Sequence, residues 1–356
     1  MQGVLILLLY KTKMNDRKTI YVSIVSYRDK LLIKTIESLL NTKSNKHNIV
    51  IGVIEQISNE DSIIFNYPEI LNNNCLIKKN NDINVEFAVY DNAILYKRYD
   101  PQYTQGVGWA RFINQYQIAP SQYDFLYQID SHMLFDDNWD EILLNDYYTA
   151  TNKVGHDKVI ITSPCKSFDV DAEGNIIDYK TNINWRGDIK FLKEFNGYIY
   201  TAVGELFPSD GNIYKSIHIC AGNSLFPAQW VFDVGNNIES FFSGEEHLLT
   251  IKSIVNGYEL FNMSIIPSYH YINTSDYETK PHKSPIIDKL TYDRYTIRSV
   301  EVLSDYINSL SKKELQRYYK YSGVNLKDKT INEESLSKID LKIIQSSKDN
   351  WKNYKN

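Results

Sequence analysis

An aspartate and a histidine stand two positions apart at the end of an apolar run, "YDFLYQIDSHMLFDDNW", residues 123–139. If this run is a strand, Asp130 and His132 face one side of the sheet and Ser131 faces the other. A carboxylate and an imidazole placed in this way either form a hydrogen-bonded pair or bind a divalent cation together. The spacing is compatible with both interpretations and by itself favours the hydrogen-bonded pair.

Two adjacent glutamates, Glu245 and Glu246, open the helical pattern "FFSGEEHLLTIKSIVNG". Ser243 and Glu246 fit a Ser-x-x-Glu capping box, and Gly257 is placed to end the helix. The two carboxylates would also lie at a helix start, where they could contact the hydroxyls or the reacting carbon of a sugar. Capping is the better explanation of Glu246, whereas no structural role accounts for Glu245.

Three further residues are weaker candidates for chemistry. His270 stands between two tyrosines in "IIPSYHYINTS", where a lone histidine is more often a core or surface residue than a ligand. Arg28 and Arg111 are the cations best placed for a diphosphate or a base. Gly106 and Gly108 lack the Lys-Ser/Thr ending of a phosphate-binding loop and the third glycine of a dinucleotide fingerprint. The other histidines form no recognisable constellation: His47, His156, His218, His247 and His282.

The elements that must position these residues alternate between strands and helices. The β-branched run 18–27 predicts a buried strand, and residues 30–40 have the apolar spacing of a helix that Asp29 could cap. The apolar runs 48–56 and 84–90 predict two more strands. This order indicates an α/β fold with a mainly parallel sheet flanked by helices.

The strand before Asp130 follows a predicted helix, "WARFINQYQIAP", which Pro120 would end. Its apolar character favours a central parallel strand that is covered on both faces. Ligands bind at the carboxyl ends of strands in open α/β sheets, which is where Asp130 would lie. The position of Asp130 therefore shifts the balance toward a functional site.

The rest of the chain divides by pattern. Residues 163–235 are expected to be rich in loops, with the turn signals "DAEGN", "WRGD" and "PSDGN". From Asp288 onward the pattern is amphipathic and helical. We expect an N-terminal extension over 1–17, a catalytic domain over 18–285 and a C-terminal helical accessory segment over 286–356.

Composition excludes several classes of protein. The net charge of −5 and the absence of a long basic block argue against nucleic-acid binding. Three widely spaced cysteines fit neither a disulfide framework nor a zinc site and indicate a reducing, intracellular environment. The seven apolar residues of 4–10 are too few to span a membrane and make a poor signal peptide, so we expect a cytoplasmic location.

Taken in order, several motifs resemble glycosyltransferase family 60, whose members attach α-linked N-acetylglucosamine to hydroxyproline of a cytoplasmic protein. The likeness covers about residues 18–275. The motifs are "VSIVSYRD", "GVIEQ", "GVGWARFINQ", "FLYQIDSHMLF", "AGNSLF", "FFSGEE" and "SYHY".

The resemblance implies a GT-A fold, a UDP-sugar donor and a Mn²⁺ or Mg²⁺ ion that bridges the two phosphates. Asp130 and His132 match the family's Asp-x-His metal motif, and His270 matches the position of a third ligand. Oxygen and imidazole ligands suit Mn²⁺. In this interpretation the strand ends in Asp-Ser-His because the pair holds the metal of the donor.

The resemblance also assigns the donor pocket. Ala221, Gly222 and Asn223 would line the sugar site. The uridine would contact Ser26, Tyr27, Arg28 and Gln56, and Arg111 and Asp130 would belong to the same nucleotide-sugar site. The family retains the configuration of the donor, so Glu245 and Glu246 would orient sugar or acceptor hydroxyls rather than act as nucleophiles.

Alternatives remain open. The acceptor could be a saccharide and the donor another UDP-sugar, because the segment "FDVDAEGNIIDYKTNINWRGDIKFLKEF" matches no family pattern. A metal-dependent phosphodiesterase would use the same aspartate and histidines but usually needs more ligands for two metals. An inactive sugar-binding relative is disfavoured by the intact motifs. The oligomeric state is undetermined.

Overall fold

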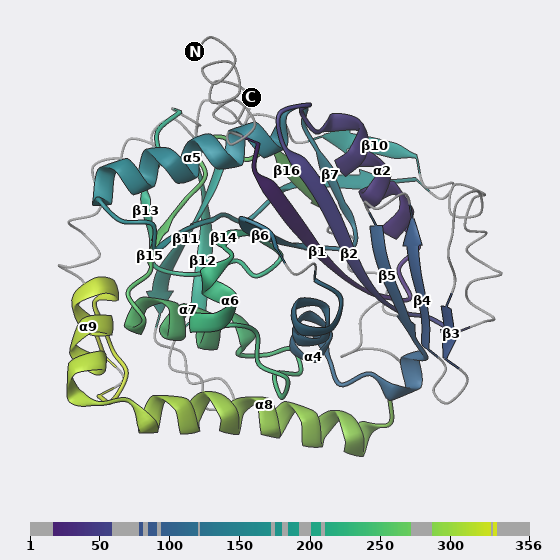
Figure 1. The fold of residues 1–356 in the computed structure, drawn as a ribbon. Coiled ribbons are helices and arrows are strands. Elements are labelled where there is room, and N and C mark those ends of the chain that lie inside the picture. The colour runs from purple at the N-terminus through teal and green to yellow at the C-terminus, as the bar shows by residue number, and fades with distance from the viewer. Residues whose placement is uncertain are drawn as a thin grey trace, which may run out of the picture.

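The structure is a computed structural model. It describes residues 17–58, 78–80, 85–90, 94–119, 122–171, 175–179, 184–191, 201–207, 211–271, 287–328 and 330–332. These residues form a large central sheet with helices on both faces (Figure 1). Residues 1–16 of the predicted N-terminal extension and Pro120 lie outside the described residues.

The central sheet has ten strands, in the order β13-β15-β8-β14-β6-β1-β2-β5-β4-β3. Their bounds in chain order are β1 Thr19–Tyr27, β2 Asn48–Gln56, β3 Lys78–Asn80, β4 Val85–Tyr90, β5 Ile94–Tyr99, β6 Phe125–Asp130, β8 Val159–Thr162, β13 Lys215–Ser216, β14 Asn223–Pro227 and β15 Glu259–Phe261. The strands predicted at 18–27, 48–56, 84–90 and before Asp130 are therefore confirmed.

Most strands of this sheet run in one direction, as predicted. The pairs β1/β2, β1/β6, β2/β5 and β15/β8 are parallel, while β4, β13 and β14 run the opposite way. The central strand β6 is thus parallel to β1 on one side but antiparallel to β14 on the other. This antiparallel neighbour was not predicted, and it has a consequence for the site: it places the start of β14 beside Asp130.

The helices cover both faces of the sheet (Figure 1). Alternation along β1 explains this: Ile20 packs into one core cluster with α2 and α5, whereas Tyr21 packs into the other with α6 and α7. The helices are α2 Leu32–Thr42, α4 Val107–Ile113, α5 Trp139–Val154, α6 Gln229–Asp233, α7 Glu245–Val255, α8 Lys289–Ser309 and α9 Lys312–Ser322, with a 3₁₀ turn at Pro101–Tyr103 and a π-helical turn at Asn114–Ile118.

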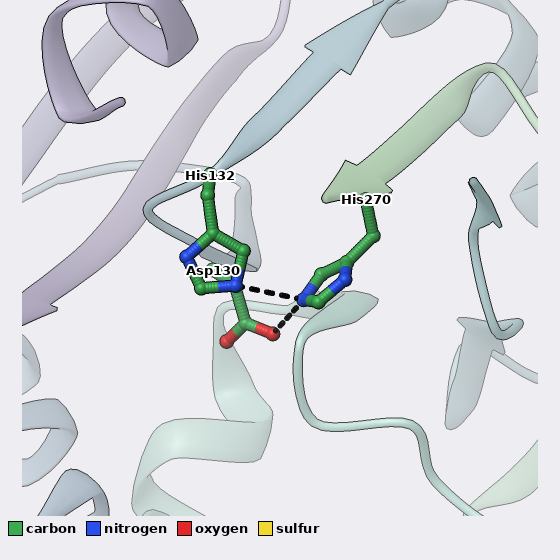
Figure 2. A group of neighbouring side chains, drawn as sticks. All are labelled: Asp130, His132 and His270. Atoms are coloured by element: carbon green, nitrogen blue, oxygen red, sulfur yellow. Dashed lines mark hydrogen bonds and ion pairs between the residues drawn. The ribbon is translucent and has the colours of Figure 1, made fainter. Parts of the chain in front are cut away.

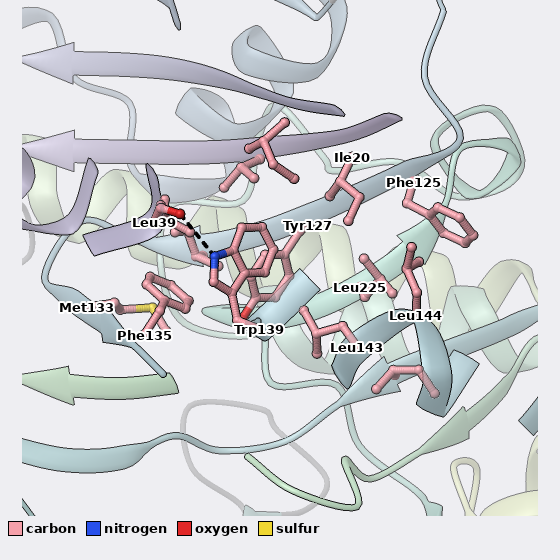
Figure 3. Packing of buried hydrophobic residues seen from close by; sticks show 14 of the residues in the cluster. Ile20, Leu39, Phe125, Tyr127, Met133, Phe135, Trp139, Leu143, Leu144 and Leu225 are labelled. Carbon is pink, nitrogen blue, oxygen red and sulfur yellow. Dashed lines mark hydrogen bonds between the residues drawn. The ribbon is translucent and has the colours of Figure 1, made fainter. Parts of the chain in front are cut away.

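Trp139 anchors the first core cluster directly behind the metal-motif strand. It is fully buried, stacks on Tyr127 of β6 and donates a hydrogen bond from its indole nitrogen to the carbonyl of Leu39 (3.1 Å; Figure 3). The indole thereby has its polar atom satisfied while its rings fill the core. This packing joins α2, α5 and β6 in one core cluster.

A second sheet of four strands continues from the central one. Its order is β10-β9-β16-β7, with β7 Met133–Phe135, β9 Lys166–Val170, β10 Ile176–Tyr179 and β16 Ser268–Tyr271. Two further strands, β11 Asn184–Phe191 and β12 Thr201–Phe207, form a hairpin. The turn prediction at "WRGD" was wrong, because these residues lie inside β11. The central residues of "DAEGN", 172–174, and the first three of "PSDGN", 208–210, lie outside the described residues.

The helical pattern after Asp288 is confirmed in α8 and α9, which a short hairpin follows, β17 Val324–Asn325 and β18 Thr330–Ile331. Val302 and Leu303 of α8 and Tyr318 of α9 belong to the same core cluster as α7. The predicted accessory segment therefore shares its core with the sheet. The domain boundaries themselves remain a prediction.

Candidate active site

The metal motif lies where β6 ends. Asp130 is the last residue of β6, as predicted, but His132 lies in the turn that connects β6 to β7. The two side chains do lie together, as predicted, but strand alternation is not the reason. The turn, rather than the pleat, brings His132 beside Asp130.

His270 completes the cluster from a distant part of the chain. Strand β16 pairs antiparallel with β7, with His270 opposite Met133. His270 Nε2 lies 2.9 Å from His132 Nε2 and 3.3 Å from Asp130 Oδ2 (Figure 2). Its side chain is 30% exposed, so it lines the site and is not a core histidine.

These three side chains fit a divalent cation. One donor atom from each of Asp130, His132 and His270 lies within 4.8 Å of the others. A carboxylate with two imidazoles suits Mn²⁺, and the lone pairs of two neutral imidazoles at 2.9 Å would repel without a cation or a proton between them. Burial and the neighbouring His132 lower the pKa of His270, which favours the neutral form that binds metals.

Asp29 supports the cluster from behind. The prediction that Asp29 caps the following helix was wrong, because the residue at that position is Leu31 and no side chain caps α2. Instead, Asp29 Oδ2 lies 2.5 Å from His132 Nδ1 and accepts a hydrogen bond from the Ser131 hydroxyl (2.6 Å). Burial alone would raise the pKa of Asp29, but the charge of His132 and these hydrogen bonds hold it below its usual value.

Arg111 connects the metal motif to the glutamates. Its guanidinium donates to Glu245 Oε2 (2.7 Å) and to Asp130 Oδ1 (2.9 Å), and the residue is only 3% exposed. Burial would lower the pKa of Arg111, but the two carboxylates raise it, so the guanidinium stays charged. Arg111 thus lies in the predicted site. Its two terminal nitrogens contact carboxylates of the chain itself.

The predicted capping box at the start of α7 does not form. The residue at the N-cap is Gly244 in a left-handed conformation (φ 84°), and no side chain caps the helix. Glu246 instead accepts a hydrogen bond from the amide of Ala221 (2.8 Å) and contacts His218 Nε2 (3.4 Å). Both glutamates therefore reach toward the donor-pocket residues, and the end of the helix at Gly257 is as predicted.

The "AGN" segment lies directly against Asp130. The amide of Asp130 donates to the carbonyl of Gly222 (3.3 Å), and a Cβ on Gly222 would lie 2.2 Å from Asp130 Oδ2. Asn223 is fully buried and accepts from Tyr127 (2.6 Å). Only a glycine at 222 leaves the carboxylate in its observed place.

The predicted uridine contacts gather at the carboxyl ends of β1 and β2. The amide of Arg28 donates to the carbonyl of Gln56 (3.0 Å), and the Gln56 amide contacts the carbonyl of Ser26 (3.4 Å). Ser26 Oγ and Gln56 Oε1 are buried without a hydrogen-bond partner among the described residues. Arg28 has a left-handed backbone (φ 50°), which for a residue other than glycine is uncommon and is often found at functional sites.

Comparison with protein families decides the class of the protein. The family model for Glycosyltransferase (GlcNAc) matches residues 19–280, well over half of the chain. The chain belongs to this glycosyltransferase family. A search of curated protein sequences finds no match.

A solved structure, that of GalNAc-T7, supports the fold of this glycosyltransferase. GalNAc-T7, solved with UDP, GalNAc and Mn²⁺, aligns over 90% of this chain and 54% of its own, with a TM-score of 0.56 and 16% identity. TarS of S. aureus, residues 1–349 with UDP-GlcNAc, aligns over 86% of this chain and 72% of its own, with a TM-score of 0.43 and 14% identity. The glycosyltransferase has a GT-A-like fold, as predicted, and it spans about half the length of the GalNAc-T7 chain.

Two site residues of the glycosyltransferase were missed by sequence reasoning. Asp29 was assigned to a helix cap, although its position just after the first strand places it at the same sheet edge as Asp130. His218 was left unassigned and contacts Glu246. No local pattern marks His218, because its partner is 28 residues away.

No helix within the described part of the chain has the length and apolar character needed to cross a membrane.

Proposed function

We propose that this glycosyltransferase transfers N-acetylglucosamine from UDP-GlcNAc to a hydroxyl group of a protein, with hydroxyproline as the leading acceptor. The observation that carries the proposal is the cluster of Asp130, His132 and His270 at the carboxyl ends of the strands. The family supports N-acetylglucosamine as the transferred sugar. GalNAc-T7, with its UDP and Mn²⁺, supports a metal-dependent UDP-sugar site on this fold.

Asp130, His132 and His270 would hold the cation, Mn²⁺ or Mg²⁺. A cation bound there supplies positive charge that stabilises the departing diphosphate. Asp29 holds the His132 ring with Nε2 toward the site, and Arg111 holds the second oxygen of Asp130. The chain's own residues thus orient two of the three ligands before the donor binds.

The nucleotide end of the donor would bind Ser26, Tyr27, Arg28 and Gln56. The position of these residues supports the assignment, because they lie together at the carboxyl ends of the parallel strands β1 and β2, where ligands bind in open α/β sheets. The sugar would lie along 221–223, between the metal site and α7. Glu245 and Glu246 would then orient its hydroxyls or those of the acceptor.

The reaction in this proposal retains the configuration of the donor. The bond between the anomeric carbon and the phosphate oxygen breaks, and the acceptor oxygen bonds to the same face of the sugar. The leaving phosphate takes the proton of the acceptor hydroxyl, so no protein side chain has to act as base or nucleophile. The buried Arg111–Glu245 pair fits a positioning role for Glu245, since its carboxylate is engaged.

Two other functions compete with this proposal. A transferase that builds a glycan from another UDP-sugar would use the same metal site. A phosphodiesterase with two metals would need a second cluster of ligands, whereas the described residues contain one group of this kind. A cytoplasmic location remains a prediction that rests on the cysteine pattern and on the family resemblance.

Two measurements test the proposal. The first is UDP release from UDP-GlcNAc in the presence and absence of Mn²⁺, with UDP-GalNAc and UDP-glucose as competing donors. The second is a mass shift of one N-acetylhexosamine on two peptides that differ only in proline versus hydroxyproline. Modification of the hydroxyproline peptide alone supports the proposal. Modification of both peptides, or extension of a free saccharide with neither peptide modified, contradicts the acceptor assignment.

A further inference from the structure

We infer that Ser299 on α8 is a positioning residue for Glu245 and Glu246, because it fixes the loop 239–244 that leads into them. The inference rests on the proposed function. It extends the site into α8, which lies beyond the residues 19–280 matched by the family. Figure 1 shows α8 running past α4 and α7.

A single buried hydroxyl holds the loop at two points. Ser299 is 2% exposed, and its Oγ donates to the carbonyl of Ser243 (2.7 Å) and accepts from the amide of Phe241 (3.3 Å). Both backbone groups lie within the three residues before Gly244, the left-handed N-cap of α7. The hydroxyl therefore sets the direction in which the chain enters the helix that carries both glutamates.

The same loop is fixed by the N-terminus of α4. The amide of Val107 donates to the carbonyl of Phe241 (2.8 Å), and the amide of Gly108 donates to the carbonyl of Ser240 (3.1 Å). A Cβ on Gly106 would lie 2.1 Å from the Phe241 carbonyl oxygen, and one on Gly108 would lie 2.4 Å from that of Ser240. These glycines, which form no phosphate-binding loop, thus allow two backbones to meet directly.

Aromatic packing adds to the contact with α8. Phe241 is 2% exposed, and its ring lies 5.7 Å from that of Tyr292 and 5.4 Å from that of Tyr295. The ion pair between Arg298 and Glu239 also joins α8 to the loop, but it is exposed and contributes little. Ser299 is therefore the polar contact from α8 that the loop depends on most.

Removing the Ser299 hydroxyl should affect the position of the two glutamates but not the binding of the metal. Ser299→Ala leaves the Phe241 amide and the Ser243 carbonyl without this buried partner, so the loop loosens and the glutamates lose their fixed place beside the sugar. Asp130, His132 and His270 lie on β6, the following turn and β16, and Figure 1 shows these strands apart from α8. Turnover should fall while the affinity for Mn²⁺ stays the same.

The experiment compares Ser299→Ala, Ser299→Thr and the control Ser309→Ala, which removes a hydroxyl at the exposed end of the same helix. For Ser299→Ala we expect kcat for UDP release from UDP-GlcNAc to fall about tenfold, and amide hydrogen exchange in 239–246 to accelerate about tenfold. Ser299→Thr keeps the hydroxyl and should restore most of both. Mn²⁺ affinity should be unchanged in all three variants.

Wild-type kcat and wild-type exchange in Ser299→Ala would overturn the inference, as would equal losses in the control. If Ser299→Ala does not fold, Ser299→Cys replaces it, because a thiol fills the space but bonds weakly. If the wild-type protein releases no UDP from any UDP-sugar, the proposed function fails. Hydrogen exchange then decides by itself whether Ser299 fixes the loop.

Discussion

Asp29 Oδ2 lies 2.5 Å from Nδ1 of His132, and the opposite nitrogen of the same ring, Nε2, lies 2.9 Å from His270 Nε2. A buried carboxylate on Nδ1 selects the tautomer that carries its proton there. The lone pair of Nε2 is then directed into the site. Partners of this kind orient metal-binding histidines and make them more basic.

Replacing Asp29 with Asn should therefore weaken Mn²⁺ binding by about 10- to 100-fold, the range found for such outer partners. Isothermal titration with Mn²⁺ measures the change. Asp293→Asn, which alters an exposed carboxylate of α8, is the matched control and should bind as the wild type does. Equal affinities in Asp29→Asn and the control would contradict the orienting role of Asp29.

Alanine in place of His132 or His270 should reduce UDP-sugar turnover by at least about a hundredfold, because each removes one ligand of the cation. Both side chains are partly exposed, so the thermal midpoint of the metal-free protein should change little. Turnover and thermal unfolding are measured on the same preparations. If His270→Ala lowers stability while Mn²⁺ affinity persists, the residue is structural.

Arg111→Met should destabilise the protein by about 3 kcal/mol, because it leaves the buried Glu245 carboxylate without its partner. Adding Glu245→Gln should recover part of that loss, since a neutral amide costs less to bury. The free energy of unfolding in denaturant gives both values. Arg298→Met removes two exposed ion pairs, with Glu239 and Glu301, and should cost less than about 1 kcal/mol. Strictly additive losses would show that the two residues do not interact.

Gly222→Ala should abolish Mn²⁺ binding without unfolding the chain. The added methyl would lie 2.2 Å from Asp130 Oδ2 and must push the carboxylate away from the two histidines. Mn²⁺ titration and the thermal midpoint distinguish this local displacement from a general loss of structure. An alanine variant with normal Mn²⁺ affinity would mean that the carboxylate has room to move and still bind.

The loop before β16 should respond to pH through Asp146, whose carboxylate accepts from the amide (2.9 Å) and hydroxyl (2.6 Å) of Ser264. Burial raises the pKa of Asp146 to about 6. For an acid with a raised pKa, the stabilising contribution is complete below the unfolded pKa of about 3.9 and is lost as pH rises through the folded pKa.

The wild-type free energy of unfolding should therefore fall by roughly 2–3 kcal/mol as the pH rises from about 4 to 6. In Asp146→Asn this fall should be absent, because an amide does not titrate. Unfolding in denaturant at pH 4, 5, 6 and 7 measures it, with Asp293→Asn as the control. A variant whose stability changes with pH as steeply as that of the wild type would show that Asp146 titrates normally.

One sequence pattern occurs twice within the described residues and has two outcomes. Ser311 and Glu314 form a complete capping box at the start of α9. Ser243 and Glu246 have the same Ser-x-x-Glu spacing, but the Ser243 carbonyl is held by Ser299 and Glu246 accepts from Ala221. The local spacing makes a capping box possible. Whether it forms depends on the contacts that neighbouring elements make with the same residues.

The sequence by itself determined the elements and the chemistry available at their ends. The strand before Asp130 and the helix after Glu245 follow from local periodicity, and Asp130, His132 and His270 are candidate metal ligands through their resemblance to family motifs. Periodicity and motifs both depend on neighbouring residues in the chain.

Only the tertiary structure decided which groups meet. Arg111 and Glu245 are 134 residues apart, and Asp29 and His132 are 103 residues apart. Burial makes each such pairing obligatory, since a charge removed from water needs a partner. Which partner it finds depends on which strands and helices pack side by side.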